Sequence, residues 1–515
     1  MSEMEGALPG KAGLPPPMQS YISSDRRWRW DGYQWVPMYP PFRWPAVATP
    51  ADWRVLVAVA GAALLFDFAV RSGALGVGAS GVIASAALMV WARVSGRWAR
   101  GCAALAALAG VGLSLRASPW LQAGDLAAAV SLLVIATAIG RGGSPFDIRV
   151  RRAVGAAWQT FLHLLAAPAF LLPPARTAGG NMVGGSRDLL VAVLRGALIG
   201  IPVIAVLVAL LASADPVFAS FLNINIDPAD LSLHIFLWVT GAWLVGGLLR
   251  AASGEHVDSP TRASWQLGAP EVITALVLLD LVFVAFALAQ LASALGAGGD
   301  ALRAAGVTYS DYARSGFFQL LWVAGITFVS LLALAALVRA ESPTSRKAFK
   351  VLGLVAVALT LVILAVAWRR LALYEDAYGW TMLRFYSHAF AAWIAVAFCL
   401  LAAWIAGTRP DRRTWIYGAT ATAGLGALLV LNLVNPEALV VRFNVARSDT
   451  ATFDPQYLGG LSSDAVAESL SPDVPGRFAV RLRAAACSAI PLSRDWAALN
   501  LSSVTADVRR REACR

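Results

Sequence analysis

The chain has 515 residues, of which 58% are hydrophobic and only 14% carry a charge, and its mean hydropathy is +0.64. A soluble core of this length needs far less apolar surface, so the composition excludes a soluble globular protein and predicts one embedded in a bilayer. The formal net charge of +11 does not indicate nucleic-acid binding, because the basic residues are mostly Arg spread through short loops and form no concentrated patch.

Residues 1–52 form a polar tail that is rich in proline near its start. The tail lacks the apolar h-region and the small-residue cleavage site of a signal peptide, so we expect the first membrane helix to act as the insertion signal. The segment "SDRRWRWDGYQWVP" at 24–37 contains a central Asp-Gly pair, which is a strong signal for a hairpin with a two-residue turn.

A two-residue turn at this Asp-Gly pair would place Trp30 opposite Tyr33 and Trp28 opposite Trp35, with all four on one face. Because a two-stranded hairpin is marginal alone, the aromatic face either packs on the tail and the membrane surface or contacts a partner. The sequence favours self-packing. The segment resembles short Trp-Asp-Gly-Xaa-Xaa-Trp motifs in cytoplasmic tails of actinobacterial membrane proteins, a likeness that implies no chemistry.

Eleven apolar runs are long enough to cross about 30 Å of hydrocarbon as helices. They lie approximately at 53–71, 76–94, 98–115, 121–139, 189–213, 233–250, 271–295, 316–338, 350–368, 386–407 and 415–434. A twelfth apolar stretch at 153–174 contains a histidine and three prolines and follows the basic sequence "RVRR", a pattern typical of an interfacial or half-inserted helix. The sequence therefore predicts an all-α integral membrane protein, a polytopic bundle of about eleven transmembrane helices.

The charges of the loops predict the orientation, because Lys and Arg in short loops mark the cytoplasmic side. With eleven spans and the N-terminus inside, the internal loops hold more than twice as many Lys and Arg residues as the external loops. Counting 153–174 as a full span would place the basic segment "RAESPTSRKAFK" outside, so we predict that this stretch does not span. The residues from 435 onward are then external.

The chain is expected to divide into five sections. They are a cytoplasmic tail at 1–52, a four-helix membrane section at 53–139, a cytoplasmic loop with an interfacial helix at 140–188, a seven-helix membrane core at 189–434, and an external, small and mostly helical C-terminal domain at 435–515. Cys487 and Cys514 both lie in the last section, where an oxidising compartment permits a disulfide, and two free thiols are almost as well supported.

Polar side chains inside a membrane are costly and therefore informative. Most of them lie at the predicted outer ends of spans or in outer loops, which suggests a polar chamber that opens outward. The candidate residues of this chamber are Asp67, Asp215, Gln290, Tyr309, Asp311, Tyr312, Arg314, Arg384, His388 and Asn432. A span-end residue taken singly is more simply explained by extension to the interface. Asp280 differs, because it lies near the middle of a span, where an acid must be neutral or paired.

The usual catalytic and metal-binding signatures do not occur in the sequence. It contains no GxxxxGK[ST] phosphate loop, GxSxG elbow, HExxH or CxxC motif, and no His or Cys pair has the spacing of metal ligands. We therefore expect no cofactor and no metal site, and an enzymatic role is not favoured.

Four segments carry a family resemblance: "LRGALIGIPVIAVLVALLASADPVFA" at 194–219, "TYSDYARSGFFQLLWVA" at 308–324, "RFYSHAFAAWIAVAF" at 384–398 and "NPEALVVRFNVAR" at 435–447. Together they resemble the bacterial multi-pass membrane family known as domain of unknown function 4153/4173, over about 190 to 470. The resemblance implies that some of these positions recur in the family: Asp215, Pro216, Tyr309, Asp311, Tyr312, Arg314, Gly316, Arg384, Tyr386, Asn435 and Pro436. The family brings no established activity, so the resemblance supports a fold more than a function.

Three functional classes fit these features. The leading hypothesis is a non-enzymatic sensor, accessory or scaffold protein of the bacterial plasma membrane, whose partners are the lipid bilayer, a ligand of unknown identity and a possible membrane protein. The second is a transporter of a small solute or lipid, which would need broken helices or an internal repeat near mid-membrane. The third is a membrane glycosyltransferase with a lipid-linked donor, a class that Asp67, several other outer acids and the external C-terminal domain suit, since an outward acid could deprotonate an acceptor hydroxyl.

Overall fold

The computed structural model describes residues 23, 28–30, 35–37, 51–140, 143–147, 150–171, 204, 207–208, 211, 227–254, 267–292, 317–337, 343–407, 414–447, 454–488 and 495–514. The chain divides into two compact units, residues 1–46 and residues 47–515. The first unit contains an antiparallel hairpin of β1 (Trp28–Trp30) and β2 (Trp35–Pro37).

The hairpin has a different register from the predicted one. Trp30 pairs with Trp35 and Trp28 pairs with Pro37, so four residues rather than two separate the strands. Side chains of a strand alternate between its two faces, so a shift of two residues leaves each side chain on the same face. The aromatic pattern therefore could not distinguish the two registers. The predicted pairing of Trp28 with Trp35 is wrong, while the predicted turn lies in residues 31–34, outside the described residues.

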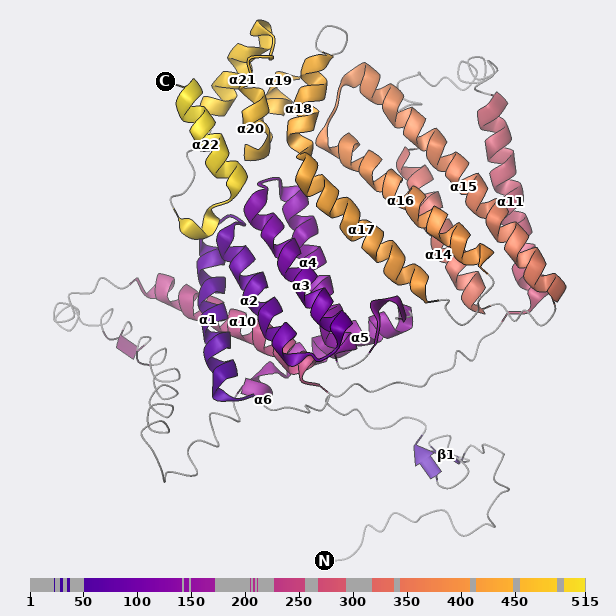
Figure 1. Cartoon of the computed structure of the whole chain (residues 1–515), viewed down its shortest axis with the longest axis horizontal. Helices are drawn as coiled ribbons and strands as arrows, with labels where there is room; N and C mark the ends of the chain where they lie inside the picture. Colours follow the sequence, from indigo (N-terminus) through magenta and orange to yellow (C-terminus); the bar gives the residue numbers. More distant parts are fainter. Residues whose placement is uncertain are drawn as a thin grey trace, which may run out of the picture. The chain divides into compact units, whose positions relative to one another are not determined.

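The second unit is mainly helical, and its helices follow the apolar runs of the sequence (Figure 1). Within the described residues, nine helices are long and apolar enough to cross a membrane: α1 (Trp53–Arg71), α3 (Arg97–Leu115), α4 (Pro119–Ile139), α10 (Pro228–Ala252), α11 (Ala269–Ala292), α14 (Phe317–Leu337), α15 (Pro343–Tyr378), α16 (Met382–Ala406) and α17 (Trp415–Val434). A shorter apolar helix, α2 (Val77–Arg93), has 17 residues. The predicted span at 189–213 lies largely outside the described residues. The chain is an all-α polytopic membrane protein.

The apolar stretch at 153–174 does not form one long helix. It contains most of α5 (Val150–Leu165), which ends after 16 residues, and the short α6 (Ala167–Leu171). A helix of 16 residues is about 24 Å long, less than the hydrocarbon thickness. α5 packs against α4 and α10, while Trp158 and Phe161 are exposed on its surface. An interfacial position of α5 agrees with these features and stays a prediction.

The spans form two groups with separate buried cores. α1, α2, α3, α4 and α10 pack together in one group. α11, α14, α15 and α16 share the largest core, in which Leu331 and Phe398 are fully buried. α17 contacts α16 of the second group and α3 and α4 of the first, so it connects the two (Figure 1).

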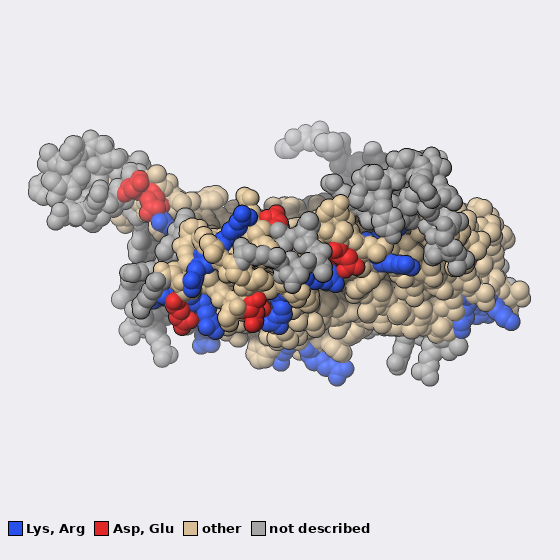
Figure 2. Space-filling view, turned by 90° about the horizontal axis from the view of Figure 1, so that it is seen from above, with Lys and Arg blue, Asp and Glu red and all other residues tan. Residues whose placement is uncertain are grey.

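In the described residues after α17 there are five short helices: α18 (Pro436–Ala446), α19 (Pro455–Gly459), α20 (Ser463–Ser469), α21 (Gly476–Ser488) and α22 (Leu501–Ala513), with the 3-10 turn η4 (Trp496–Ala498) before α22. α18, α19, α20 and α21 share a small core with the beginning of α16, in which Met382 packs with Val440 and Leu482. Figure 2 shows the molecule from above, with acidic and basic side chains side by side on this surface. Among the C-terminal helices, Arg442 and Glu468 form an ion pair at 3.0 Å.

The C-terminal helices are attached to the first group of spans through the backbone. Val77 N, at the beginning of α2, donates to Leu499 O at 2.9 Å. Gly76 permits this approach, because a Cβ atom there would lie 2.5 Å from Leu499 O. The end of the chain therefore contributes a hydrogen-bond partner to one of its first membrane helices.

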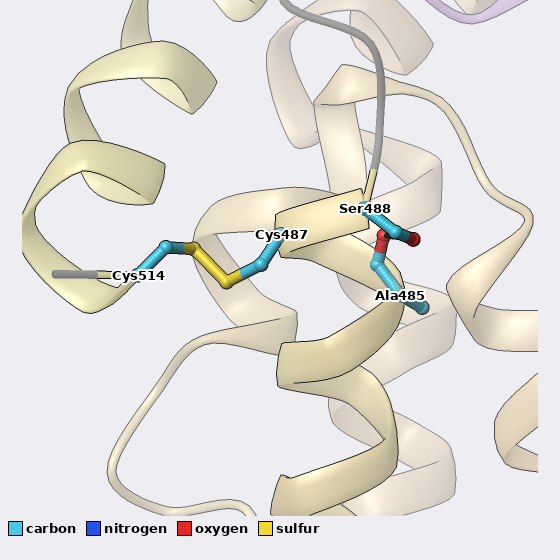
Figure 3. The surroundings of a disulfide bond; sticks show 4 residues. All are labelled: Ala485, Cys487, Ser488 and Cys514. Carbon is cyan, nitrogen blue, oxygen red and sulfur yellow. Dashed lines mark hydrogen bonds between the residues drawn. A yellow bond between two sulfur atoms is a disulfide. The ribbon is translucent and has the colours of Figure 1, made fainter.

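Cys487 at the end of α21 and Cys514, directly after α22, are joined by a disulfide with their Cα atoms 5.8 Å apart (Figure 3). Of the two alternatives that the sequence leaves open, the structure contains the bonded one. Disulfides persist in oxidising compartments, which agrees with the predicted external position of these helices.

Candidate functional site

The turn between α15 and α16 positions the candidate site. α15 continues to Tyr378, ten residues beyond its predicted end at 368, because a helix can extend past the apolar run that crosses the bilayer. Gly379 has a φ of +71°, a conformation that favours glycine, and there the chain reverses direction. Thr381 then caps α16, since its side chain accepts a hydrogen bond from Arg384 N at 3.4 Å.

Side chains from the C-terminal helices hold this turn. The Asn444 side chain accepts from Trp380 N and donates to Trp380 O, both at 2.9 Å. The Tyr457 hydroxyl accepts from Met382 N at 2.7 Å. Arg384 donates to backbone carbonyl oxygens at the end of α15. The turn is thus fixed to the C-terminal helices on one side and to α15 on the other.

A cavity of about 410 Å³ lies beside this turn, between α15, α16, α17 and α18. Its volume is in the range of small-molecule sites, which are mostly apolar and contain a few polar groups. Ten of its fourteen lining residues are apolar, and the polar ones are Glu375, Asp376, His388 and Arg447. We call this the aromatic cavity, because Trp368, Trp380 and Phe385 form part of its wall.

Glu375 and His388 form a buried pair in the wall of the aromatic cavity. His388 Nε2 lies 2.9 Å from Glu375 Oε2, and these residues are 7% and 2% exposed, respectively. The ring centroid of Trp368 lies 4.2 Å from that of His388. In the described part of the chain, Glu375 Oε1 and His388 Nδ1 have no hydrogen-bond partner. Buried polar atoms without partners are rare and costly, so this pair makes the cavity the candidate functional site.

The chemistry available to this pair follows from its geometry. When Glu375 is ionised and the imidazole is neutral, Glu375 accepts a hydrogen bond from His388 Nε2–H, and Nδ1 is then an acceptor. A carboxylate that orients an imidazole is also the arrangement of a general base. However, none of the described residues that line this cavity is Ser, Thr or Cys, so these residues offer the pair no nucleophile to activate. The arrangement favours binding of a polar group over covalent catalysis.

The residues predicted to form the outward chamber, where the structure describes them, contact different neighbours. His388 lines the aromatic cavity and Arg384 holds the turn beside it. The other three each contact a neighbouring helix: Asp67 with His234 at 2.6 Å, Gln290 with Arg370 at 3.2 Å, and Asn432 with Asp125 at 2.9 Å. The remaining candidates, Asp215, Tyr309, Asp311, Tyr312 and Arg314, lie outside the described residues.

Asp280 stands apart from these contacts. It is 7% exposed near the middle of α11, and neither carboxyl oxygen has a hydrogen-bond partner among the described residues. An ionised carboxylate without a partner is too costly in such a position, so Asp280 is neutral unless a ligand or ion reaches it.

The sequence did not reveal a second polar cluster, where the C-terminal helices meet the spans. Asp464 Oδ2 accepts from Ala117 N at 3.1 Å and from Ser118 N at 2.8 Å, directly before α4. Glu437 accepts from both the backbone N and the hydroxyl of Ser462, at 2.8 and 2.7 Å. Both acids are 3% exposed. The sequence could not identify these acids as a cluster. Their partners lie far away in the chain or outside their own helix, and the sequence does not show that the acids are buried.

The pKa of Glu437 predicts how this cluster responds to pH. Burial raises the pKa of Glu437 above its usual value, and the neighbouring Asp464 carboxylate raises it further, against the hydrogen bonds from Ser462. The folded state therefore binds this proton more tightly than the unfolded state, and the contribution of Glu437 to stability falls as the pH rises above about 4.3.

Glu437→Gln, which is neutral throughout, should be more stable than the wild type at neutral pH, and its stability should depend less on pH. Thermal unfolding in detergent between pH 4.5 and 8 measures this, with Glu468→Gln, at a half-buried acid of the same region, as the control. Parallel pH profiles of wild type and Glu437→Gln would contradict it.

In the part of the chain that the structure describes, no group of three or more His, Cys, Asp or Glu residues is arranged to hold a metal ion. Neither the curated proteins nor the solved structures contain a match to the chain. A family model described as domain of unknown function (DUF4153) matches residues 103–470, which is more than half of the chain and includes every residue that lines the aromatic cavity. The chain, a multi-pass membrane protein, therefore belongs to the family described as domain of unknown function (DUF4153).

Proposed function

We propose that the protein is a sensor or accessory protein of the bacterial plasma membrane that binds an amphipathic molecule in the aromatic cavity. The observation that carries this proposal is the combination of largely apolar walls with the buried pair of Glu375 and His388. Apolar walls favour a chain or ring, and a small number of polar groups fixes the orientation of a head group.

The position of the cavity along the spans suits a molecule taken from the bilayer. His388 is the seventh residue of α16, so it lies about 9 Å along the helix axis from Met382. Trp368 and Val430 line the cavity and are also 44% and 57% exposed on the helices that carry them. An apolar chain can therefore contact these side chains from the lipid, while its head group reaches the level of Glu375.

Trp380 connects the cavity to the C-terminal helices, so its displacement by a ligand could serve as the signal. Its ring centroid lies 5.7 Å from that of His388 and 5.1 Å from that of Phe443 in α18. Its backbone is held by Asn444 of the same helix. A ligand that displaces Trp380 would thus alter the contacts of the C-terminal helices, which are predicted to be external.

The test fills the cavity and counts the molecules that the protein retains. Ala392 lines the cavity, so Ala392→Trp should displace the ligand, whereas Leu383 is exposed on the same helix and does not line the cavity. Native mass spectrometry of the detergent-purified protein should show a bound amphipathic molecule in the wild type and in Leu383→Trp, and most of it lost in Ala392→Trp. Equal retention in all three proteins would reject the proposed site.

A transporter is the second candidate function, and the buried Asp280 favours it. A carboxyl group without partners at this depth can take up and release a proton or bind a cation. If the protein couples transport to protons, vesicles that contain it should acidify under an imposed membrane potential, as measured with an enclosed pH-sensitive dye. Asp280→Asn should abolish this flux. Absence of flux in the wild-type protein would remove proton-coupled transport as a candidate.

A further inference from the structure

We propose that the aromatic cavity selects an amphiphile whose polar end is a protonated amine attached to an apolar chain. This inference rests on the proposed function and adds the chemical class of its ligand. It follows from the charges, the unpaired acceptors and the aromatic walls of the cavity.

The charged groups of the cavity leave one carboxylate without a cationic partner in the cavity wall. Two acids, Glu375 and Asp376, line the cavity together with one guanidinium, Arg447. Arg447 Nη1 lies 2.9 Å from Asp376 Oδ1, so this cation is already paired with the acid nearer to solvent. With His388 uncharged, no cation among the described lining residues pairs with Glu375, and a cationic ligand would compensate its charge.

The two atoms without partners are both acceptors. With Glu375 ionised and His388 neutral, Glu375 Oε1 and His388 Nδ1 each offer a lone pair, and neither has a donor within the described residues. A primary ammonium group carries three N–H donors and a positive charge. It therefore matches both the hydrogen-bonding capacity and the charge of the pair, whereas a phosphate or sulfate head group would add further acceptors and a second negative charge.

The walls support the same choice. Trp368 packs on the His388 ring at a centroid distance of 4.2 Å, and Trp380 lies on the same imidazole at 5.7 Å. Indole rings attract cations through their negative faces, and a site with low water access strengthens this attraction. The alanine and valine side chains at positions 389, 392 and 430 provide the apolar surface for the attached chain.

The experiment compares two probes that have the same chain and opposite charge. The full-length protein in nanodiscs of a zwitterionic lipid is titrated with dodecylamine, which is protonated at pH 7, and with dodecyl phosphate. The wild type should bind dodecylamine at least tenfold more tightly than it binds dodecyl phosphate. Glu375→Gln should lose about tenfold in dodecylamine affinity, while Glu468→Gln, whose carboxylate pairs with Arg442 in the C-terminal helices, should bind as the wild type does.

A second variant tests the inference even if Glu375→Gln fails to fold. Trp368 is 44% exposed, so Trp368→Leu should fold, and it should weaken binding of dodecylamine but not of dodecyl phosphate. Tighter binding of dodecyl phosphate would overturn the inference, because it would mean that an imidazolium donates from Nδ1. Equal affinity for both probes would also overturn it and would leave the proposed function intact. If neither probe binds and Ala392→Trp does not change the molecules that the protein retains, both this inference and the proposed function are rejected.

Discussion

Replacing Asp464 by alanine is expected to destabilise the junction between the C-terminal helices and the spans by about 3 kcal/mol. The change removes the acceptor of Ala117 N and Ser118 N, and Ser118 is fully buried. A buried donor left without a partner costs roughly 1–3 kcal/mol, and this change removes the acceptor of two backbone donors at once. Hydrogen exchange of the amides at 117–122, measured on the detergent-purified protein, should accelerate accordingly.

Glu468 on the same helix provides the matched control. Its carboxylate pairs with Arg442, whose side chain is 63% exposed, and exposed ion pairs contribute about 0–1 kcal/mol. Glu468→Ala should therefore leave the exchange at 117–122 almost unchanged. Asp464→Asn keeps one acceptor oxygen and should fall between the wild type and Asp464→Ala. An unchanged exchange rate in Asp464→Ala would show that water satisfies these amides equally well.

Loss of the disulfide is expected to lower the free energy of unfolding of α21 and α22 by about 3 kcal/mol. The bond joins residues 27 positions apart, and closing a loop of this size restricts the unfolded chain by roughly that amount. Cys514→Ser should therefore increase proteolytic cleavage within 476–514 at a temperature where the wild type resists it. Treatment of the wild type with a reductant should have the same effect.

The two cysteines within the spans serve as controls for this measurement. Cys102 is buried and Cys399 is exposed, and both are free thiols. Cys399→Ala should leave the cleavage of 476–514 unchanged, with or without reductant. If Cys514→Ser and the wild type are cleaved at the same rate, the contacts of α21 and α22 with their neighbours are sufficient to hold them.

The helices of the membrane part could be predicted because lipid permits few alternatives. A backbone in hydrocarbon must satisfy its own hydrogen bonds, so an apolar run of sufficient length becomes a helix whatever its neighbours are. The prediction for 415–434 coincides with α17. The helix ends were less predictable, as α15 shows, because hydropathy marks where the apolar residues stop and not where the helix stops.

The partners of polar residues could not be predicted, because they depend on which helices become neighbours. Asn432 and His388 were both identified as candidates, but Asn432 donates to Asp125 of α4, which is 307 residues away. Glu375 lies beyond the apolar run predicted to end at 368, and only the extended α15 places it beside His388. The aromatic cavity likewise combines residues of four helices, and no local pattern in any of them indicates it.

The hydrogen bond from Val77 N to Leu499 O also implies an order of assembly during synthesis. The acceptor is made more than 400 residues after the donor. At 5–20 residues per second, α2 is complete about 20 to 80 s before its partner exists. During this interval the first turn of α2 must be hydrated or be covered by the insertion machinery. The end of the chain thus closes the first group of spans last, and a chain released before Leu499 would leave that group unfinished.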